Sequence, residues 1–265
     1  MAHLHVITGA ESRAAAHLEI RKIRPHDLVD ALRLGMQDFA ALPSHAIFLC
    51  LIYPIIGFVL ARLVFGYDTL PLLFPLATGF ALVGPFAALG LYELSRRREQ
   101  GIDSSWDHAF DILRSPSLGA IAALGFLLVA LFVGWLATAQ AIYQSLFGVL
   151  APNSILGFLN EVLTTREGWL LIAYGNAAGF LFAVAVLAIS VVSFPLLLDR
   201  DVGAAVAIMT SLRAVARNPL VMALWGLIVA ALLVIGSLPF FLGLAVVMPV
   251  LGHATWHLYR KVVVS

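Results

Sequence analysis

Charged side chains are scarce in this sequence. Asp, Glu, Lys and Arg make up 12% of its 265 residues, whereas hydrophobic residues make up 62%. A soluble domain usually contains about 25% charged and about 45–50% apolar residues. The core of a chain this short cannot cover such an excess of apolar surface. The composition therefore excludes an ordinary soluble domain and predicts a protein that folds in lipid.

Cysteine and the common catalytic motifs are also lacking. Cys50 is the single cysteine, so no disulfide can form within the chain. The sequence has no Gly-rich phosphate loop, no Gly-x-Ser-x-Gly, no His-Glu-x-x-His and no Cys-x-x-Cys. The net charge of +1 gives no reason to expect nucleic-acid binding. We therefore expect neither enzymatic activity nor a nucleic-acid partner.

Long apolar runs are abundant. A helix needs about 20 apolar residues to cross the roughly 30 Å hydrocarbon core of a bilayer. Six runs reach that length, at about 46–65, 69–92, 117–139, 169–198, 219–238 and 239–259. They are continuous rather than alternating, which favours helices over the strands of a membrane barrel. We predict an all-α, polytopic membrane protein with six transmembrane helices.

Short turns indicate that neighbouring spans pair as hairpins. Gly66-Tyr67-Asp68 separates the first two runs, and the last two meet at Gly236-Ser237-Leu238-Pro239. We predict three hairpins in a single membrane domain over residues 24–265. A flexible cytoplasmic N-terminus is expected over residues 1–23.

Lysine and arginine are distributed unevenly between the two predicted faces of the membrane. They gather in the N-terminal segment, in the connections after the second and fourth spans, and at the C-terminus. Only Arg62 and Arg166 fall on the other side. Because cytoplasmic loops carry an excess of these residues, we predict that both termini face the cytoplasm.

A three-fold pattern runs along the chain. An amphipathic, basic-ended segment precedes each pair of apolar runs, at about 27–39, 106–116 and 202–219. Their apolar residues recur at the spacing of one helix face. This face is formed by Leu28, Leu32, Met36 and Phe39 in the first segment, and by Val206, Met209, Leu212 and Val215 in the third. We predict three helices lying in the plane of the cytoplasmic interface.

Each even-numbered span also carries a proline before its basic end. These residues are Pro85, Pro195 and Pro249. The recurrence favours an internal repeat that arose by triplication, but the spacing is irregular and chance similarity stays an alternative. In a transporter built from repeats, these prolines would break helices beside the substrate path.

Two histidines are the first candidates for a binding site. His253 and His257 are four residues apart, so they share one face of the sixth span. Neutral imidazole binds haem iron, copper or zinc. Zinc would need about two further ligands, and no Asp, Glu or Cys lies near these histidines in the sequence. We favour interfacial or helix-contact histidines and keep haem binding as the alternative.

A second candidate lies in the fourth span. Gly175, Asn176 and Gly179 form a small-xxx-small pattern around one polar residue. Such patterns allow close helix packing, and a central asparagine can form a hydrogen bond across the contact. We predict helix packing at this site, with a substrate path as the alternative.

Three motifs carry a family resemblance. They are Arg24-Pro25-His26-Asp27-Leu28, Trp106-Asp107-His108-Ala109-Phe110 and Ser193-Phe194-Pro195-Leu196-Leu197-Leu198-Asp199-Arg200. With them the chain resembles a bacterial integral-membrane family of unknown function, from about Ile20 to Tyr259. Some members carry a cytochrome c oxidase subunit label. The resemblance implies a location in the bacterial inner membrane and brings no established activity.

The oxidase label can be compared with the residues. For a catalytic subunit of a haem–copper oxidase, the label would imply about twelve spans, with histidines on several of them. This chain has six predicted spans, and it lacks the His-Pro-Glu-Val-Tyr type of motif. The label is therefore compatible with an accessory subunit and not with the catalytic one.

These observations lead to one expected function and two alternatives. We expect a non-enzymatic accessory or assembly component of a larger membrane complex, such as a respiratory one. Its partners would be the lipid bilayer and other membrane protein subunits, and it would need no cofactor. The alternatives are a small-molecule transporter or channel, and a haem- or metal-binding membrane protein that uses His253 and His257.

Overall fold

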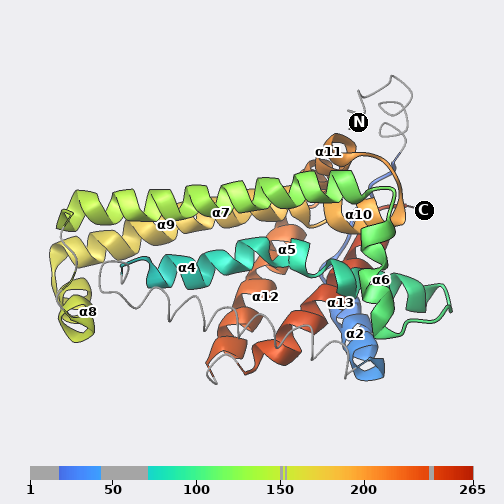
Figure 1. The fold of residues 1–265 in the computed structure, drawn as a ribbon, viewed down its shortest axis with the longest axis horizontal. Helices are drawn as coiled ribbons and strands as arrows, with labels where there is room; N and C mark the ends of the chain where they lie inside the picture. The colour runs from blue at the N-terminus through green and yellow to red at the C-terminus, as the bar shows by residue number, and fades with distance from the viewer. Residues whose placement is uncertain (1–17, 43–70, 150–151, 153, 239–241, 265) are drawn as a thin grey trace. The chain divides into compact units, whose positions relative to one another are not determined.

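The structure is a computed structural model that describes residues 18–42, 71–149, 152, 154–238 and 242–264. Nearly all of these residues lie in helices, which confirms the predicted all-α class (Figure 1). In chain order the helices are α2 (Pro25–Ala41), α4 (Leu73–Phe80), η2 (Ala81–Val83), α5 (Gly84–Ala87), α6 (Leu89–Glu99), η3 (Trp106–Arg114), α7 (Leu118–Phe147), α8 (Ile155–Thr164), α9 (Arg166–Ser190), α10 (Ser193–Asp199), α11 (Ala204–Arg217), α12 (Pro219–Ser237) and α13 (Leu244–Val262). The two η segments are 3-10 helices.

Four helical segments of the described part are long and apolar enough to cross a membrane. They are Phe74–Glu99, Leu118–Phe147, Arg166–Asp199 and Pro219–Ser237. They correspond to the second, third, fourth and fifth predicted spans. The first predicted span, 46–65, lies outside the described residues.

The sixth predicted span, at 239–259, is not confirmed. α13 begins within this run, but it is not among the four candidate spans. Its second half carries His253, His257 and two basic residues, which lower its mean hydropathy. Most of its residues from Pro249 onward are buried against other helices. The arrangement as three hairpins is likewise not confirmed.

The chain divides into two compact units. Unit 1 comprises Met1–Leu51, Pro85–Leu124 and Leu187–Ser265, and unit 2 comprises Ile52–Gly84 and Gly125–Val186. In unit 1, α13 is a central helix that packs against α2, α6, α10 and α12. Figure 1 shows α2 lying beside α13.

Glycines permit the close contacts of α13 in unit 1. A Cβ atom at Gly35 of α2 would lie 2.6 Å from the backbone nitrogen of Ala254. A Cβ atom at Gly252 of α13 would lie 2.6 Å from Cδ1 of Leu91 on α6. Small residues at both points let the backbones approach closely, as in helix pairs of membrane proteins.

The two ends of the described chain meet in unit 1. Ile20 and Val263 form an isolated antiparallel bridge, with hydrogen bonds from Arg21 N to Val262 O (2.8 Å) and from Val264 N to Glu19 O (3.0 Å). Residues 18–23 of the expected flexible N-terminus are therefore attached to the C-terminal segment. Residues 1–17 lie outside the described ranges.

In unit 2, α7 and α9 lie side by side (Figure 1). The rings of Trp135 and Phe182 are 5.9 Å apart between these two helices. The indole nitrogen of Trp135 also donates a hydrogen bond to the carbonyl oxygen of Pro75 on α4, at 2.9 Å. Ser154 caps the short helix α8 by accepting a hydrogen bond from Gly157 N at 3.0 Å.

Two of the three prolines coincide with breaks in candidate spans. Between α4 and α6 the chain passes through the 3-10 turn η2 and the single turn α5, which contains Pro85. α9 ends before a turn at 191–192, and Pro195 lies in the first turn of the following helix, α10. Pro249 lies inside α13 without ending it. Proline is tolerated in the first turn of a helix, but elsewhere in a helix it removes a backbone hydrogen bond.

The three amphipathic segments are helical, but their buried faces differ from the predicted ones. α2 buries Leu28, Ala31, Gly35 and Asp38, and α11 buries Val206, Ala207, Thr210, Ser211 and Ala214. Met36 and Met209 of the predicted stripes are instead about half exposed. The middle segment forms the 3-10 helix η3 rather than an α-helix. In both α-helices the buried face contains small and polar residues, because helix backbones approach closely only where the side chains between them are small.

Candidate functional site

A carboxylate lies on the buried face of α2. Leu28, Ala31, Gly35 and Asp38 recur at intervals of three and four residues, so all four face α13. The helix begins at Pro25, and Asp27 accepts a hydrogen bond from the backbone nitrogen of Arg24 at 2.8 Å. Asp38 follows three turns later, with only 7% of its side chain exposed. A buried carboxylate is stable only if other groups pair with it.

Three side chains pair with Asp38. Ser95 of α6 donates to Oδ2 at 2.7 Å, and Nε2 of His257 on α13 lies 2.7 Å from the same oxygen. The guanidinium of Arg98, at the end of α6, forms an ion pair with Oδ1. The carboxylate therefore joins the three helices α2, α6 and α13. Together with His253, these residues form the Asp38 cluster.

Ser95 also connects the carboxylate to His253. Its hydroxyl oxygen lies 2.7 Å from Nδ1 of His253, whose side chain is completely buried. Because the hydroxyl group donates its hydrogen bond to Asp38, its oxygen is left to accept a hydrogen bond from Nδ1–H of His253. This assigns the Nδ1–H tautomer to His253. Its Nε2 then carries a lone pair, and no partner for that atom is present in the described residues.

The hydrogen bonds of the cluster stabilise the charged form of Asp38. Burial raises the pKa of this carboxyl, but the hydrogen bonds from His257 and Ser95 are the main causes that lower it, and they outweigh that effect. The net pKa lies below the ordinary value of 3.8. Asp38 is thus a buried anion, held in place by donors from two other helices.

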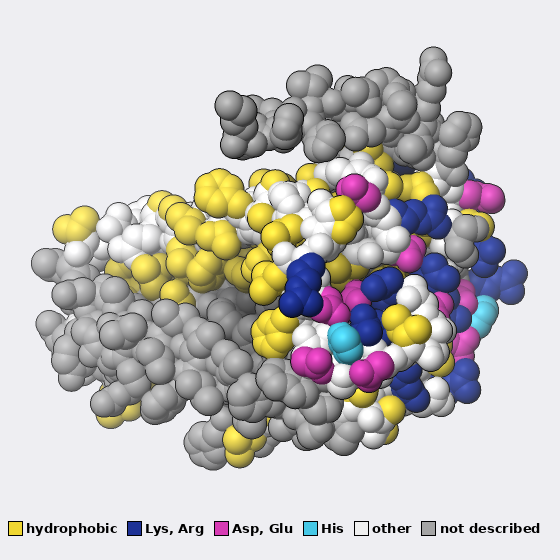
Figure 2. All heavy atoms as spheres, turned by 45° about the vertical axis from the view of Figure 1, so that its right-hand side comes forward, with side chains coloured by type: hydrophobic (Ala, Val, Ile, Leu, Met, Phe, Trp, Pro, Cys, Tyr) yellow, Lys and Arg dark blue, Asp and Glu magenta, His cyan; other side chains and the backbone are white. Residues whose placement is uncertain are grey.

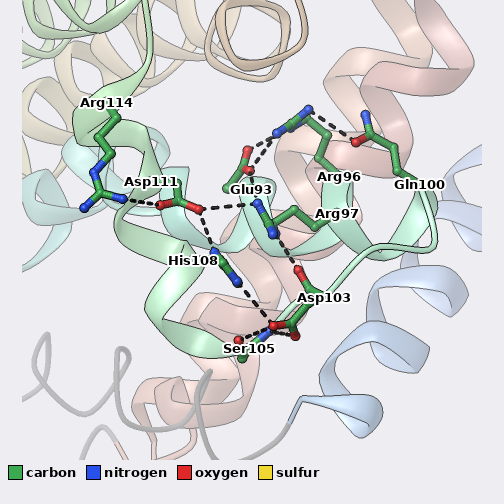
Figure 3. A network of polar contacts seen from close by, with 9 residues as sticks. All are labelled: Glu93, Arg96, Arg97, Gln100, Asp103, Ser105, His108, Asp111 and Arg114. Atoms are coloured by element: carbon green, nitrogen blue, oxygen red, sulfur yellow. Dashed lines mark hydrogen bonds and ion pairs between the residues drawn. The ribbon is translucent and has the colours of Figure 1, made fainter.

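A second polar network joins α6 to η3 (Figure 3). Glu93 accepts two hydrogen bonds from Arg96, at 2.7 and 2.8 Å. Arg97 forms an ion pair with Asp111 of η3 at 3.3 Å. Figure 3 shows the guanidinium of Arg97 between Asp111 and Asp103, which follow α6 in the chain. This network fixes the loop after α6 against the helix itself.

His108 closes the network between α6 and η3. Its Nδ1 lies 2.7 Å from Asp111 and its Nε2 lies 3.3 Å from Asp103 (Figure 3). Two carboxylates on opposite ring nitrogens favour the doubly protonated imidazolium. The hydrogen bond with Asp111 is the main cause that raises the pKa of His108 above its ordinary value.

A third set of polar contacts lies at the C-terminal end of α13. Tyr259 donates a hydrogen bond to Asp199 of α10 at 2.6 Å. Trp256 and Arg260 donate to the two carboxylate oxygens of Glu99 at 2.9 and 3.0 Å. Figure 2 shows positive, negative and histidine side chains gathered close together on the surface. At this end of α13, Glu99 and Asp199 are thus paired with side chains of the same unit.

An apolar hollow lies beside the Asp38 cluster. It has a volume of about 250 Å³ and is lined by Leu32 and Met36 of α2, Leu232 of α12, and Val246, Val247 and Val250 of α13. Among the residues that the structure describes, no polar group lines it. The hollow can therefore accept an apolar group, but it brings no reactive side chain to that group.

The structure brings together the two predicted histidines and partners that the sequence analysis missed. His253 and His257 both belong to the Asp38 cluster. Asp38 and Ser95 are far from them in sequence, so local spacing gave no indication of the contact. The spacing of Asp38 from Leu28 and Gly35 was a usable signal, since it places a carboxylate on the packed face. In the ranges described, no three His, Cys, Asp or Glu side chains are placed to hold a metal ion.

The glycine motif of α9 is divided between two environments. A Cβ atom at Gly179 would lie 3.1 Å from the indole of Trp135, whereas nothing lies within 4 Å of one at Gly175. The side chain of Asn176 is exposed and donates to Ile172 O of its own helix at 2.7 Å. Helix packing therefore involves Gly179, and the predicted bond of Asn176 across the contact is replaced by one within α9.

A comparison with known protein families adds an identity for the middle of the chain. Residues 72–199, just under half of the sequence, match the family described as "Predicted integral membrane protein (DUF2189)". The match contains Ser95 and Arg98 but not α2 or α13, which supply Asp38 and both histidines. No curated protein and no solved structure matches the chain. Together with the four candidate spans, the match identifies a multi-pass integral membrane protein that is similar to a membrane family of unknown function.

Proposed function

We propose that the protein is a non-enzymatic accessory or assembly component of a larger membrane complex. The observation that carries this proposal is the internal pairing of the polar groups in unit 1. Asp38, Ser95, His257 and Arg98 are bound to one another, and the adjacent hollow is lined by apolar side chains alone. This arrangement supports a structural role, because the polar groups of the Asp38 cluster bind one another rather than facing this hollow.

The candidate span α12 supports the same proposal. Only 17% of its most apolar stretch is buried within the chain. Leu227 and Val234 are 65% and 61% exposed. A helix with so little cover inside its own chain has room for helices of other subunits as well as for lipid.

Site-specific photocrosslinking in native membranes tests this proposal. A benzophenone amino acid in place of Leu227 should capture one defined membrane protein in near-stoichiometric yield. The same group in place of Met222, which is fully buried on α12, is the matched control and should capture none. A protein that runs alone in mild detergent and crosslinks only to lipid would overturn the proposal.

We also propose that the complex lies in the bacterial inner membrane and that both chain ends face the cytoplasm. The resemblance to a bacterial family and the basic residues near both ends support this placement. If the captured partner is a respiratory subunit, the respiratory assignment follows. Reporter fusions that are active only outside the cytoplasm should be inactive at both termini.

A transporter or channel for a small apolar substrate is the second candidate. Two observations favour it: the apolar hollow, and the helix breaks beside Pro85 and Pro195. Broken helices often form substrate sites in transporters. Uptake by proteoliposomes above that of empty vesicles, abolished by Val247→Trp in the hollow, would favour this function over the accessory role.

The histidines fit haem less well than they fit the Asp38 cluster. Nε2 of His257 is already 2.7 Å from Asp38, and Nδ1 of His253 is already 2.7 Å from Ser95. Haem ligation by both would require His257 to leave the carboxylate. We therefore assign both histidines to helix contacts, and we expect the purified protein to show no Soret band and no stoichiometric metal.

A further inference from the structure

Two basic segments that are distant in sequence are joined at Asn218. This buried residue lies between α11 and α12. Its side chain accepts a hydrogen bond from Ile23 N at 2.9 Å and donates one to Arg21 O at 3.0 Å. The N-terminal segment is therefore fixed next to the basic end of α11. We call Arg21, Lys22, Arg24, Arg213 and Arg217 the basic patch.

The side chains of the basic patch are exposed and have no acidic partner. All five residues are exposed, and none forms an ion pair within the described residues. Every other described Lys or Arg except Arg166 forms at least one ion pair. Glu19 and Asp27 are the acidic residues nearest in sequence to the three N-terminal members, and Asp201 is the nearest to the two on α11. Asp27 already pairs with Lys261, so the five cations of the patch keep a net positive charge. Unpaired cations concentrated at one place indicate an anionic ligand from outside the chain.

The position of the patch indicates which anion it binds. Candidate span α12 begins at Pro219, directly after Asn218, so the patch lies where this helix enters the bilayer. Apolar side chains flank it: Met209 and Leu212 on the exposed face of α11, and Leu220 with 84% exposure at the start of α12. A surface for nucleic acid or for an acidic protein would not need this apolar border. Arginine and lysine beside interfacial apolar residues are typical of contact with anionic lipids.

We propose that the basic patch binds the phosphate groups of anionic phospholipids in the leaflet that α12 enters. The apolar residues of α11 would insert below the headgroups, while Arg213 and Arg217 extend to the phosphates. A guanidinium can donate two parallel hydrogen bonds to one phosphate. The N-terminal residues Arg21, Lys22 and Arg24 add a second row of charge to the same surface.

Lipid selectivity of the full-length protein in bilayers tests this proposal. The protein is reconstituted with spin-labelled phosphatidylglycerol or phosphatidylcholine, and the motionally restricted fraction gives their relative association constant. We expect the wild type to prefer phosphatidylglycerol about five-fold, the effect of one basic residue near an anionic surface. The triple variant Lys22→Gln, Arg213→Gln, Arg217→Gln should lower this preference to about one. About 0.5 M salt should weaken the wild-type preference in the same direction.

A matched control removes three equally exposed charges elsewhere. The variant Arg33→Gln, Arg114→Gln, Arg166→Gln loses the same net charge outside the patch and should keep the wild-type preference. If the patch variant does not fold, the variant Arg213→Lys, Arg217→Lys keeps the charge and should keep most of the preference. Its loss there would limit the site to guanidinium chemistry and support the bidentate contact.

Three outcomes would overturn the proposal. Equal loss of the preference for phosphatidylglycerol in the patch and control variants would mean that the preference depends on the net charge of the protein and not on the basic patch. An unchanged preference in the patch variant would assign the patch to another anion, such as an acidic protein or a nucleic acid. Loss of the preference in millimolar inorganic phosphate, at constant ionic strength, would indicate a site for free phosphate rather than for a lipid headgroup.

Discussion

At the scale of single residues, the side chain of Asp38 links three helices. Its two oxygens receive groups from α6 and α13, and it lies on α2 itself. The sequence pointed to His253 and His257 but could not pair them with Asp38, because nothing local encodes a contact across more than 200 residues. The missing companion ligands, which could be read from the sequence, are the reason why helix-contact histidines were predicted rather than metal ligands.

Neutralising Asp38 should destabilise the protein. Asp38→Asn keeps the size of the side chain but removes the negative charge that pairs with Arg98 and His257. The NH2 group of the new amide would also face hydrogen-bond donors where a carboxylate oxygen now accepts. Breaking a buried charged group's contacts costs about 3–5 kcal/mol. We expect about 2–3 kcal/mol here, since Arg98 is 39% exposed. Thermal unfolding followed by tryptophan fluorescence measures the effect, because Trp256 is buried in the same unit.

Asp30→Asn is the matched control for this measurement. Asp30 lies on the same helix, but its side chain is 38% exposed and its ion pairs with Arg33 and Lys261 are at 3.4 and 3.2 Å. An exposed pair contributes less than about 1 kcal/mol. Equal losses in the two variants would contradict the special role of the Asp38 cluster.

The stability of the loop after α6 should depend on pH through His108. Its pKa is raised in the folded state, so its contribution is complete below the ordinary value of 6.5. The contribution is lost as the pH rises through the higher folded pKa. The difference in melting temperature between wild type and His108→Gln should therefore be largest below pH 6.5 and shrink as the pH rises above that value. A difference for His108→Gln that stays constant over this pH range would refute the mechanism.

At the scale of helices, the contact between α2 and α13 organises unit 1. The sequence predicted that α2 is a helix, because its apolar residues recur every three to four positions. It also predicted a position flat on the membrane, since an amphipathic pattern does not tell a lipid surface from a protein surface. The buried face contains Ala31, Gly35 and Asp38, which no hydrophobicity pattern would select. What decides the contact is the close approach at Gly35.

Filling the space at Gly35 should separate α2 from α13. A Cβ atom there would lie 2.8 Å from the carbonyl oxygen of Val250 and 2.6 Å from the nitrogen of Ala254, and neither backbone atom can rotate away. Gly35→Ala should cost about 1–3 kcal/mol or more in unfolding free energy. Gly119→Ala in α7 is the control, because no atom lies within 4 Å of its Cβ position and helix propensity favours alanine by up to about 1 kcal/mol. Similar melting temperatures for the two variants would contradict the close approach.

The two glycines of α9 should respond differently to the same substitution. Gly179→Leu would press against Trp135 on α7, where the Cβ atom already lies 3.1 Å from the indole ring. Overpacking of this kind costs about 1–3 kcal/mol. Gly175→Leu places the same side chain in open space and should change the melting temperature little. The reverse order would show that α9 packs through its other face.

At the scale of the whole molecule, the chain ends are the feature that sequence reasoning could not supply. Composition and run length predicted the four candidate spans of the described residues, because both are local properties and lipid imposes a minimum length. The sixth span that the same reasoning predicted, at 239–259, is not confirmed, since α13 is not among the candidate spans of the described residues. The bridge between Ile20 and Val263 could not be predicted from the sequence, since a single residue pair is too short to show the alternating pattern of a strand.

A disulfide should form between the two ends. The hydrogen bonds on either side of Ile20 and Val263 make them a non-hydrogen-bonded pair, for which Cα atoms are about 4.5 Å apart. That separation lies within the range for disulfides. In a Cys50→Ser background, Ile20→Cys with Val263→Cys should oxidise readily, as a gel shift that reductant reverses. Arg21→Cys with Val263→Cys places the thiols on opposite faces and should oxidise much less; equal yields would contradict the bridge.

The bridge and the packing of α2 on α13 have a consequence for the order in which the protein is made. A ribosome adds about 5–20 residues per second, so on the order of 10–40 s pass between the completion of α2 and the start of α13. Throughout that time the histidines of the Asp38 cluster have not been made, and Gly35 lacks the backbone of α13 against which it packs. α2 must therefore wait for α13, which is made much later. A nascent chain that stalls before α13 would leave an amphipathic helix whose Asp38 has Ser95 and Arg98 but neither histidine, exposed to the quality-control proteases of the cell.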